Sequence, residues 1–303
     1  MKCCCSGVDL GKFNSNEPKP LYYHPRGILW IGDAITWLTS LESESVDLVF
    51  ADPPYNIKKA EWDTFDSQQH YVEWSLQWIE QAARILKPTG TLYICGFPEI
   101  IADIKLPASR FFQGCRWLIW HYKNKANLAN DWGRSHESIL HFRKTKTFKF
   151  NLDNVRIPYS NHTLKYPEHP QAPSSQYGNS GNNDGRKWHP HLKGAKPRDV
   201  IEIPTTCNGM TEKTKHPTQK PEELVRKFVM SSSERGDVVV DPFVGSGTTI
   251  VVAEQLGRKW LGCEINLDYA QWAVERIQNA KQMTDEEWFW FDRANEERRK
   301  KIR

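Results

Sequence analysis

Two short apolar runs in this sequence each end in an aspartate followed by a turn, and this repeated pattern restricts the fold most. Val46–Ala51 reads VDLVFA and leads into Asp52-Pro53-Pro54-Tyr55. Val238–Val240 leads into the segment Asp241–Thr249, which reads DPFVGSGTT. Nearly continuous apolar runs rich in valine are typical of strands buried on both faces of a parallel sheet. Because ligands bind at the carboxyl ends of such strands, both turns are candidate functional segments.

Helical and strand-like segments alternate along most of the chain. Apolar residues recur at helical spacing from Tyr71 to Leu86, and the segment Lys87–Gly90 (KPTG) is expected to end that helix. Further strands are expected at 91–95, 116–122, 137–142, 199–203 and 259–263, and further helices at 221–231, after the glycines up to Gly257, and at 267–283. This alternation predicts an α/β fold with a doubly wound, mainly parallel sheet.

The texture of the sequence suggests a division of the chain. Residues 1–26 are rich in Pro, Lys, Asn and Gly and are expected to form a loose lead-in. Residues 27–121 and 198–283 carry the strands and helices of the main domain. Between them, residues 122–197 end in a long irregular stretch, which in a compact domain is usually functional or disordered. Residues 284–303 form a C-terminal tail, whose last residues, Glu296–Arg303 (EERRKKIR), are expected to be a frayed helix end.

Composition limits the class of protein but does not name a function. The chain of 303 residues carries 41 Lys and Arg against 37 Asp and Glu, a net charge of +4. No apolar run approaches the roughly 20 residues that cross a membrane, and the N-terminus lacks the apolar region of a secretion signal. We therefore expect a cytoplasmic protein with no membrane partner. Its seven cysteines lack metal-binding spacing, so no metal site is expected, and most of its 13 tryptophans are expected in the core.

The glycine-containing turn after the second strand predicts a nucleoside site. Gly245 and Gly247 allow a tight turn and close approach of the backbone to a ligand at a helix start. The third glycine of a dinucleotide fingerprint is missing, and no phosphate-binding lysine follows. Glu264 ends the next strand, 23 residues after Asp241, where a carboxylate can accept hydrogen bonds from ribose hydroxyls.

The turn after the first strand is built from hydrogen-bond acceptors. Pro53 and Pro54 have fixed φ angles and no N–H donors, so this turn offers the Asp52 carboxylate and carbonyl oxygens. Such a rigid set of acceptors, beside the ring of Tyr55, fits an exocyclic amino group on a flat base.

Together these motifs resemble the S-adenosylmethionine-dependent amino-methyltransferases of DNA. The catalytic motif Asp52–Tyr55 precedes the cofactor motif Asp241–Thr249, an order similar to the β-type permutation of that family. Three smaller segments agree with the resemblance: Gly32-Asp33, Arg134–Leu140 (RSHESIL) and His216–Pro221 (HPTQKP). The resemblance covers about Ile28 to Gln278 and implies a Rossmann-like methyltransferase sheet, with an inserted target-recognition region at 122–197.

The resemblance also implies the cofactor and the site residues. S-adenosyl-L-methionine would be lined by Phe243, Gly245 and Gly247 of the Asp241 motif, with its methionine carboxylate held by Ser246 or Thr248. Glu264 would hold the ribose, Asp33 would contact the adenine, and Lys220 would lie near the methionine end. Asp52, Pro53, Pro54 and Tyr55 would form the catalytic motif: Asp52 and the Pro53 carbonyl would accept the N–H groups of the target amine, and Tyr55 would stack on a flipped-out base.

The target is expected to be double-stranded DNA. An aspartate at the first motif position is associated in the family mostly with adenine N6, so adenine N6 is favoured; cytosine N4 is the main alternative, followed by an RNA base or a protein amide. Six basic residues are expected to contact DNA: Lys123, Lys125, Arg134, His136, Arg143 and Lys144. A companion restriction endonuclease and a homodimer stay open, as does the target sequence.

Overall fold

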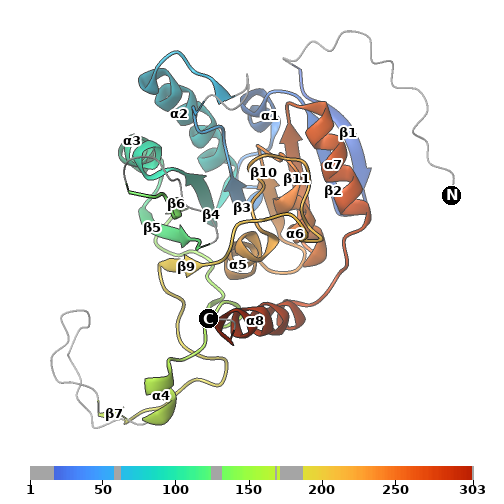
Figure 1. Cartoon of the computed structure of the whole chain (residues 1–303). Helices are drawn as coiled ribbons and strands as arrows, with labels where there is room; N and C mark the ends of the chain where they lie inside the picture. The colour runs from blue at the N-terminus through green and yellow to red at the C-terminus, as the bar shows by residue number, and fades with distance from the viewer. Residues whose placement is uncertain (1–16, 58–62, 124–131, 168, 171–186, 302–303) are drawn as a thin grey trace.

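A computed structural model describes residues 17–57, 63–123, 132–167, 169–170 and 187–301, and it contains one large sheet (Figure 1). In this part of the chain, nine strands follow the order β1-β2-β11-β10-β3-β4-β6-β5-β9. Their bounds are β1 Lys19–His24, β2 Gly27–Ile31, β3 Val46–Ala51, β4 Leu86–Gly96, β5 Gly114–His121, β6 His136–Arg143, β9 Val200–Glu202, β10 Val238–Asp241 and β11 Lys259–Glu264.

The centre of the sheet is parallel, as the apolar runs predict. β2, β11, β10, β3 and β4 all run in one direction, and every residue of β3 is buried. β10 pairs directly with β3, with Val240 opposite Val49. The prediction of an α/β fold with a mainly parallel sheet is therefore confirmed.

Antiparallel pairs lie on both sides of this parallel centre, and they bear on two predicted boundaries. β6 lies between β4 and β5 and pairs antiparallel with both, although it falls inside the predicted recognition region 122–197. Residues 136–143 are therefore part of the sheet core. Likewise β1, within the predicted lead-in, pairs with β2 as an edge strand. The predicted break at Lys87–Gly90 does end a helix, but these residues continue directly into β4.

Two groups of helices cover the sheet. α1 (Ala34–Ser40), α2 (Gln68–Ile85) and α3 (Pro98–Ala108) contact one another in series, and α5 (Glu222–Ser232), α6 (Thr248–Gln255) and α7 (Leu267–Gln278) form a second series. The α2 helix begins at the N-cap Ser67 and buries Tyr71, Trp78 and Ile79, which lie on the predicted apolar stripe. α7 ends five residues earlier than Met283, the expected end.

The remaining elements lie outside the sheet and its helices. The predicted C-terminal tail contains the 17-residue helix α8 (Asp285–Lys301), whose Trp288 and Phe289 are buried. α4 (Asn161–Lys165) and the two-residue strands β7 (His169–Pro170) and β8 (Lys187–Trp188) belong to the irregular region. In Figure 1, α4 and β7 project away from the sheet. In the described part of the chain, none of the helices is long and apolar enough to cross a membrane.

Candidate active site

The strand order brings the two sequence motifs together. β11, β10 and β3 are neighbours, so their carboxyl ends place Glu264, Asp241 and Asp52 side by side at one edge of the sheet. A cavity of about 230 Å³ opens there. Its lining includes all four predicted catalytic residues and most of the predicted cofactor residues: Asp52, Pro53, Pro54, Tyr55, Asp33, Lys220, Asp241, Phe243, Gly245, Ser246, Thr248 and Glu264.

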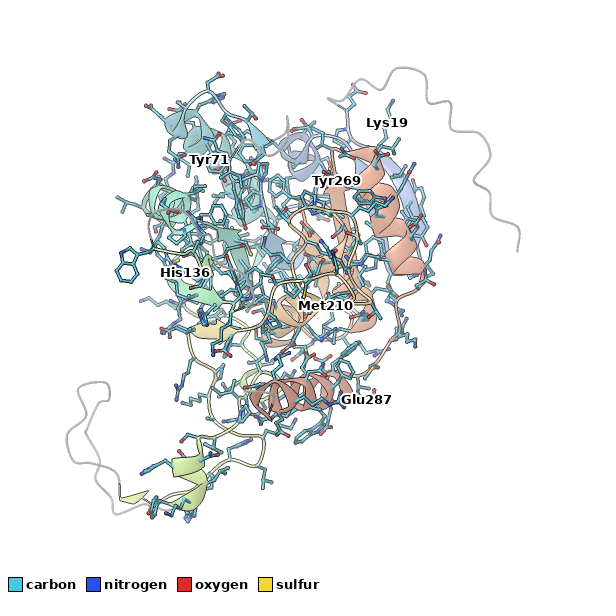
Figure 2. The ribbon with its side chains drawn as sticks, viewed as in Figure 1. Lys19, Tyr71, His136, Met210, Tyr269 and Glu287 are labelled. Atoms are coloured by element: carbon cyan, nitrogen blue, oxygen red, sulfur yellow. The ribbon has the colours of Figure 1, made fainter. Side chains whose placement is uncertain are left out.

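The Asp52–Tyr55 turn is held in place by two side chains outside the motif. The buried Asp63 carboxylate accepts hydrogen bonds from the backbone N–H groups of Tyr55 (2.6 Å) and Ile57 (3.3 Å). Tyr71, labelled on α2 in Figure 2, donates its hydroxyl to the Pro54 carbonyl at 2.6 Å. Neither residue was predicted as part of the site. The turn is thus rigid because of its prolines and because its backbone groups are bound on both sides.

A charged cluster surrounds Asp52. The Lys220 ammonium lies 2.8 Å from Asp52 Oδ2 and 3.3 Å from Glu137 Oε2. The Tyr55 hydroxyl lies 2.7 Å from Asp52 Oδ1 and 3.1 Å from the same Glu137 oxygen. Although burial alone lowers the pKa of Lys220, the carboxylates of Asp52 and Glu137 raise it above its usual value, so this lysine is charged. The cluster holds two carboxylates and one ammonium group.

Tyr55 is more enclosed than its predicted function suggests. Its side chain is 7% exposed, and its ring packs edge-on against Phe97 with 4.9 Å between the centroids. Burial and the nearby Asp52 raise the pKa of its hydroxyl well above the usual value, which keeps the hydroxyl protonated and able to donate. The ring lines the cavity. Its stacking on a base stays a prediction.

At the other end of the cavity, Glu264 organises the glycine turn. Its carboxylate accepts the backbone N–H of Gly245 at 2.6 Å and that of Asn266 at 2.9 Å. Burial raises the pKa of Glu264, and these hydrogen bonds oppose the rise. Gly247, the N-cap of α6, has φ +88°, and a Cβ atom there would lie 2.7 Å from the Ala273 Cβ of α7. Gly247 therefore allows the glycine turn to pack closely against α7.

Two hydroxyl groups of the glycine turn are held by Arg276 of α7. Arg276 Nη1 donates to the Ser246 carbonyl at 2.8 Å and reaches the hydroxyls of Ser246 (3.3 Å) and Thr248 (3.2 Å). The Thr248 hydroxyl in turn donates to the Lys220 carbonyl at 3.2 Å. Since a hydroxyl has one proton to donate, the Thr248 proton is used within the protein. Of the two predicted carboxylate-binding hydroxyls, the geometry therefore favours Ser246.

Three further residues line the cavity near these groups. Asp33 caps α1, accepting the Thr36 N–H at 2.8 Å, and also faces the cavity. Burial raises the pKa of Asp241 to about 7, and its Oδ1 accepts the Phe243 N–H at 2.9 Å. His216 packs against Gly245, and burial lowers its pKa to about 4, so its imidazole is neutral at pH 7.

The predicted basic surface divides between two edges of the sheet. Because β6 runs antiparallel to β4, His136 lies at the carboxyl edge beside the cavity, whereas Arg143 lies opposite Thr91 toward the far edge. Figure 2 labels His136 at the start of β6. Lys144 donates to the Ala83 carbonyl at the end of α2, at 2.6 Å. DNA contact by Arg143 and Lys144 therefore stays a prediction, at a different edge of the sheet from His136.

Two of the remaining basic candidates, Arg134 and Lys123, lie on the side of the cavity. Arg134 donates to Glu99 at 3.0 Å, and its guanidinium lies 3.8 Å from the centroid of the Phe97 ring, which also contacts Tyr55. Lys123 pairs with Glu202 at 2.9 Å on a half-exposed surface. Lys125 lies outside the described residues.

Glu137 and Asp63 are among the site residues that the sequence analysis did not select, as is Tyr71. Glu137 falls within the quoted Arg134–Leu140 segment, and the available signal was an acidic residue at the start of an otherwise apolar strand. Asp63 follows a segment with no regular pattern, and its partners are backbone groups, so its sequence neighbourhood carries no signal.

Comparisons with known proteins agree with this geometry. A family model described as DNA methylase matches residues 46–275. The Type II methyltransferase M.HpaI of Haemophilus parainfluenzae is 34% identical over 271 residues, covering 87% of this chain and 76% of the relative. The DNA adenine methyltransferase YhdJ of Escherichia coli K12 is 33% identical over 268 residues, covering 84% of each chain.

Solved structures share the fold. PvuII DNA methyltransferase, described as cytosine-N4-specific, superposes with a TM-score of 0.65 at 20% identity and covers 90% of this chain and 94% of that chain. A DNA modification methylase of Thermus thermophilus, complexed with S-adenosyl-L-methionine, gives a TM-score of 0.55 at 24% identity and covers 82% of this chain and 94% of that chain. The chain therefore belongs to the DNA methylase family, the amino-methyltransferases that act on adenine N6 or cytosine N4 of DNA.

Proposed function

We propose that this DNA methyltransferase methylates the N6 amine of adenine within a specific double-stranded sequence. The observation that carries the proposal is Asp52, whose carboxylate lies at the cavity next to the Pro53–Pro54 turn. In the family that the motifs resemble, an aspartate at this position is associated mostly with adenine. The relative named as an adenine methyltransferase, at 33% identity over 84% of each chain, supports the same base. The second candidate is cytosine N4, because both amines present the same two N–H groups.

The cavity residues fit S-adenosyl-L-methionine, the methyl donor. A carboxylate has about four acceptor positions, and the N–H groups of Gly245 and Asn266 leave Glu264 with capacity for ribose hydroxyls. Phe243 adds an aromatic wall, and Asp33 lies at the same end as Glu264. Ser246 offers a hydroxyl toward the methionine carboxylate. When bound, the cofactor supplies an electrophilic methyl group on a sulfonium centre.

Asp52 and Pro53 prepare the amine. The lone pair of an exocyclic amine is delocalised into the base ring, so the amine is a weak nucleophile. Hydrogen bonds from its two N–H groups to the Asp52 carboxylate and the Pro53 carbonyl favour a tetrahedral nitrogen with an available lone pair. Positioning and the fixed negative potential of the site supply the main catalytic effect. No covalent bond to the protein is required.

The neighbouring cysteine is unsuited to the alternative chemistry at cytosine C5. Cys95 is buried, and burial raises the pKa of its thiol well above the usual value. A protonated, enclosed thiol is a poor nucleophile, and thiolate attack is what C5 methylation requires.

Access to a paired base requires that it be flipped out of the duplex, at a cost of about a few kcal/mol. We propose that Arg134, His136 and Lys123, at the cavity side of the sheet, contact the DNA beside the opened base pair. Trp132, which is 97% exposed, adds an aromatic surface next to Arg134. The irregular region after β6 supplies the base-reading contacts in this proposal. A companion endonuclease and a homodimer also stay proposals.

The test is to identify the methylated nucleoside. The purified protein is incubated with methyl-labelled S-adenosyl-L-methionine and a mixture of double-stranded DNAs, which are then digested and separated by chromatography. Label in N6-methyl-2′-deoxyadenosine is the expected result. Label in N4-methylcytosine would replace adenine with the second candidate, and label in neither nucleoside would contradict the proposal.

A further inference from the structure

Both oxygens of Asp52 are engaged by groups of the protein itself. Oδ1 accepts the Tyr55 hydroxyl at 2.7 Å, and Oδ2 accepts the Lys220 ammonium at 2.8 Å. The ammonium neutralises the charge that should polarise an incoming amine. Asp52 is therefore poorly prepared for catalysis in this arrangement, unless another group can take over Lys220 and Tyr55.

Glu137 lies where such a group would have to lie. Its Oε2 atom is 3.3 Å from Lys220 Nζ and 3.1 Å from the Tyr55 hydroxyl, so one oxygen faces both donors that occupy Asp52. Both distances exceed those to Asp52 by 0.4 to 0.5 Å. A small movement of either donor therefore exchanges a bond to Asp52 for one to Glu137.

The charges of the cluster show what Glu137 contributes to the site. Lys220 is 5% exposed and Glu137 is 14% exposed, so their interaction is only weakly screened by water. With Glu137 present, the cluster of two carboxylates and one ammonium has a net charge of −1. Without it, the Lys220–Asp52 pair is neutral, and the site loses the negative potential that stabilises positive charge developing on the amine.

We propose that Glu137 is a positioning residue that receives Lys220 and the Tyr55 hydroxyl when the target amine binds, and so releases Asp52 for catalysis. This inference rests on the proposed amino-methyltransferase function. β6 then contributes Glu137 to the site in addition to forming part of the sheet. Glu137 touches neither cofactor nor base in this scheme; it acts through Lys220 and Tyr55.

The experiment compares four proteins in single-turnover methylation of DNA: wild type, Glu137→Gln, Tyr55→Phe and the double variant. Glu137→Gln keeps the size of the side chain but removes its charge. It is expected to lower the rate of transfer about tenfold to a hundredfold, the range for loss of a charged hydrogen bond, while cofactor affinity stays within about twofold. Glu137→Asp, which keeps the charge, is expected to restore part of the rate.

The double variant distinguishes the proposed release of Asp52 from a purely structural function of Glu137. If Glu137 serves to draw Tyr55 and Lys220 away, removing the Tyr55 hydroxyl should partly free Asp52 in the Glu137→Gln background. The double variant should therefore transfer the methyl group at least about threefold faster than Glu137→Gln alone. Tyr55→Phe would then raise the rate that Glu137→Gln lowers, so the two substitutions would not be additive. Glu223→Gln is the matched control, because it removes one carboxylate from an ion pair with Arg299 outside the cavity.

Each remaining outcome decides against the inference. A Glu137→Gln protein with the wild-type rate, a double variant less than about threefold faster than Glu137→Gln, or loss of cofactor binding in Glu137→Gln would overturn it while leaving the function intact. A wild-type protein that transfers no methyl group to DNA would overturn the proposed function together with the inference.

Discussion

Lys220 is the cation on which the charged cluster depends, and Lys220→Met tests this dependence without an activity assay. The substitution keeps a long side chain but leaves Asp52 and Glu137 facing each other without a positive charge. Lys220 is 5% exposed and lies 2.8 and 3.3 Å from the two carboxylates. Removing one partner of a buried ion pair typically costs about 3–5 kcal/mol of unfolding free energy.

Urea unfolding measures this cost. With a denaturant dependence of about 3 kcal/mol per molar urea, the unfolding midpoint should fall by about 1 to 1.7 M. Adding Glu137→Gln to Lys220→Met removes one of the opposed charges and should recover at least about half of the loss. Lys123→Met is the control, because its ion pair with Glu202 is half-exposed and should cost about 1 kcal/mol at most.

A Lys220→Met protein that unfolded within about 1 kcal/mol of wild type would contradict this dependence on Lys220. A double variant less stable than Lys220→Met would also contradict it, since the carboxylates would then not repel each other.

Three further predictions follow from single residues of the site. Asp52→Ala should lower the rate of methyl transfer by at least about a hundredfold to a thousandfold. Calorimetry should show that cofactor binding is retained, because Lys220 keeps Glu137 as its partner. Loss of cofactor binding would mean that the functions assigned to these residues are wrong. Gly247→Ala should be less stable in urea than Gly236→Ala by about 1–3 kcal/mol. Both glycines have φ +88°, but only at position 247 does the new Cβ atom meet a neighbour, the Cβ atom of Ala273 at 2.7 Å. Equal stabilities of the two variants would contradict this close packing. Because burial lowers the pKa of His216 to about 4, the folded state resists protonation, and stability should fall as pH drops from about 6.5 to 4, by up to about 3 kcal/mol. Unfolding measured across this pH range should show a smaller fall in His216→Gln.

The local sequence pattern was sufficient to predict the strands and helices that carry the site residues. β3 and β10 follow from apolar runs that end at Asp52 and at Asp241, because strands buried on both faces need such runs. Pro221 and Gly257 similarly mark the start of α5 and the end of α6. The site at the carboxyl edge then follows from the general behaviour of parallel sheets.

The pairing of strands that are distant in sequence could not be predicted from local sequence in the same way. The run of basic residues from Lys123 to Lys149 looks continuous in sequence, but β6 reverses direction inside it and separates His136 from Arg143 across the sheet. Lys149 instead pairs with Asp237 at the start of β10. Strand direction depends on long-range pairing, which local composition does not encode.

The same limit applies to Glu137. As a residue in an isolated strand it looks like an ordinary exposed charge, and only the antiparallel insertion of β6 beside β4 places it against Lys220. Its partners lie 82 and 83 residues away in sequence, at Tyr55 and Lys220.

In the proposed function, the adenine amine is methylated in the cavity beside Asp52. The most direct test is the N6-methyladenine content of DNA from a methylation-deficient host that expresses either the wild-type chain or Asp52→Ala, measured by mass spectrometry of the digested nucleosides. N6-methyladenine is expected with the wild type, and only the background of the host with Asp52→Ala. Methylation by Asp52→Ala at the wild-type level, or no N6-methyladenine from the wild type, would contradict the proposed function.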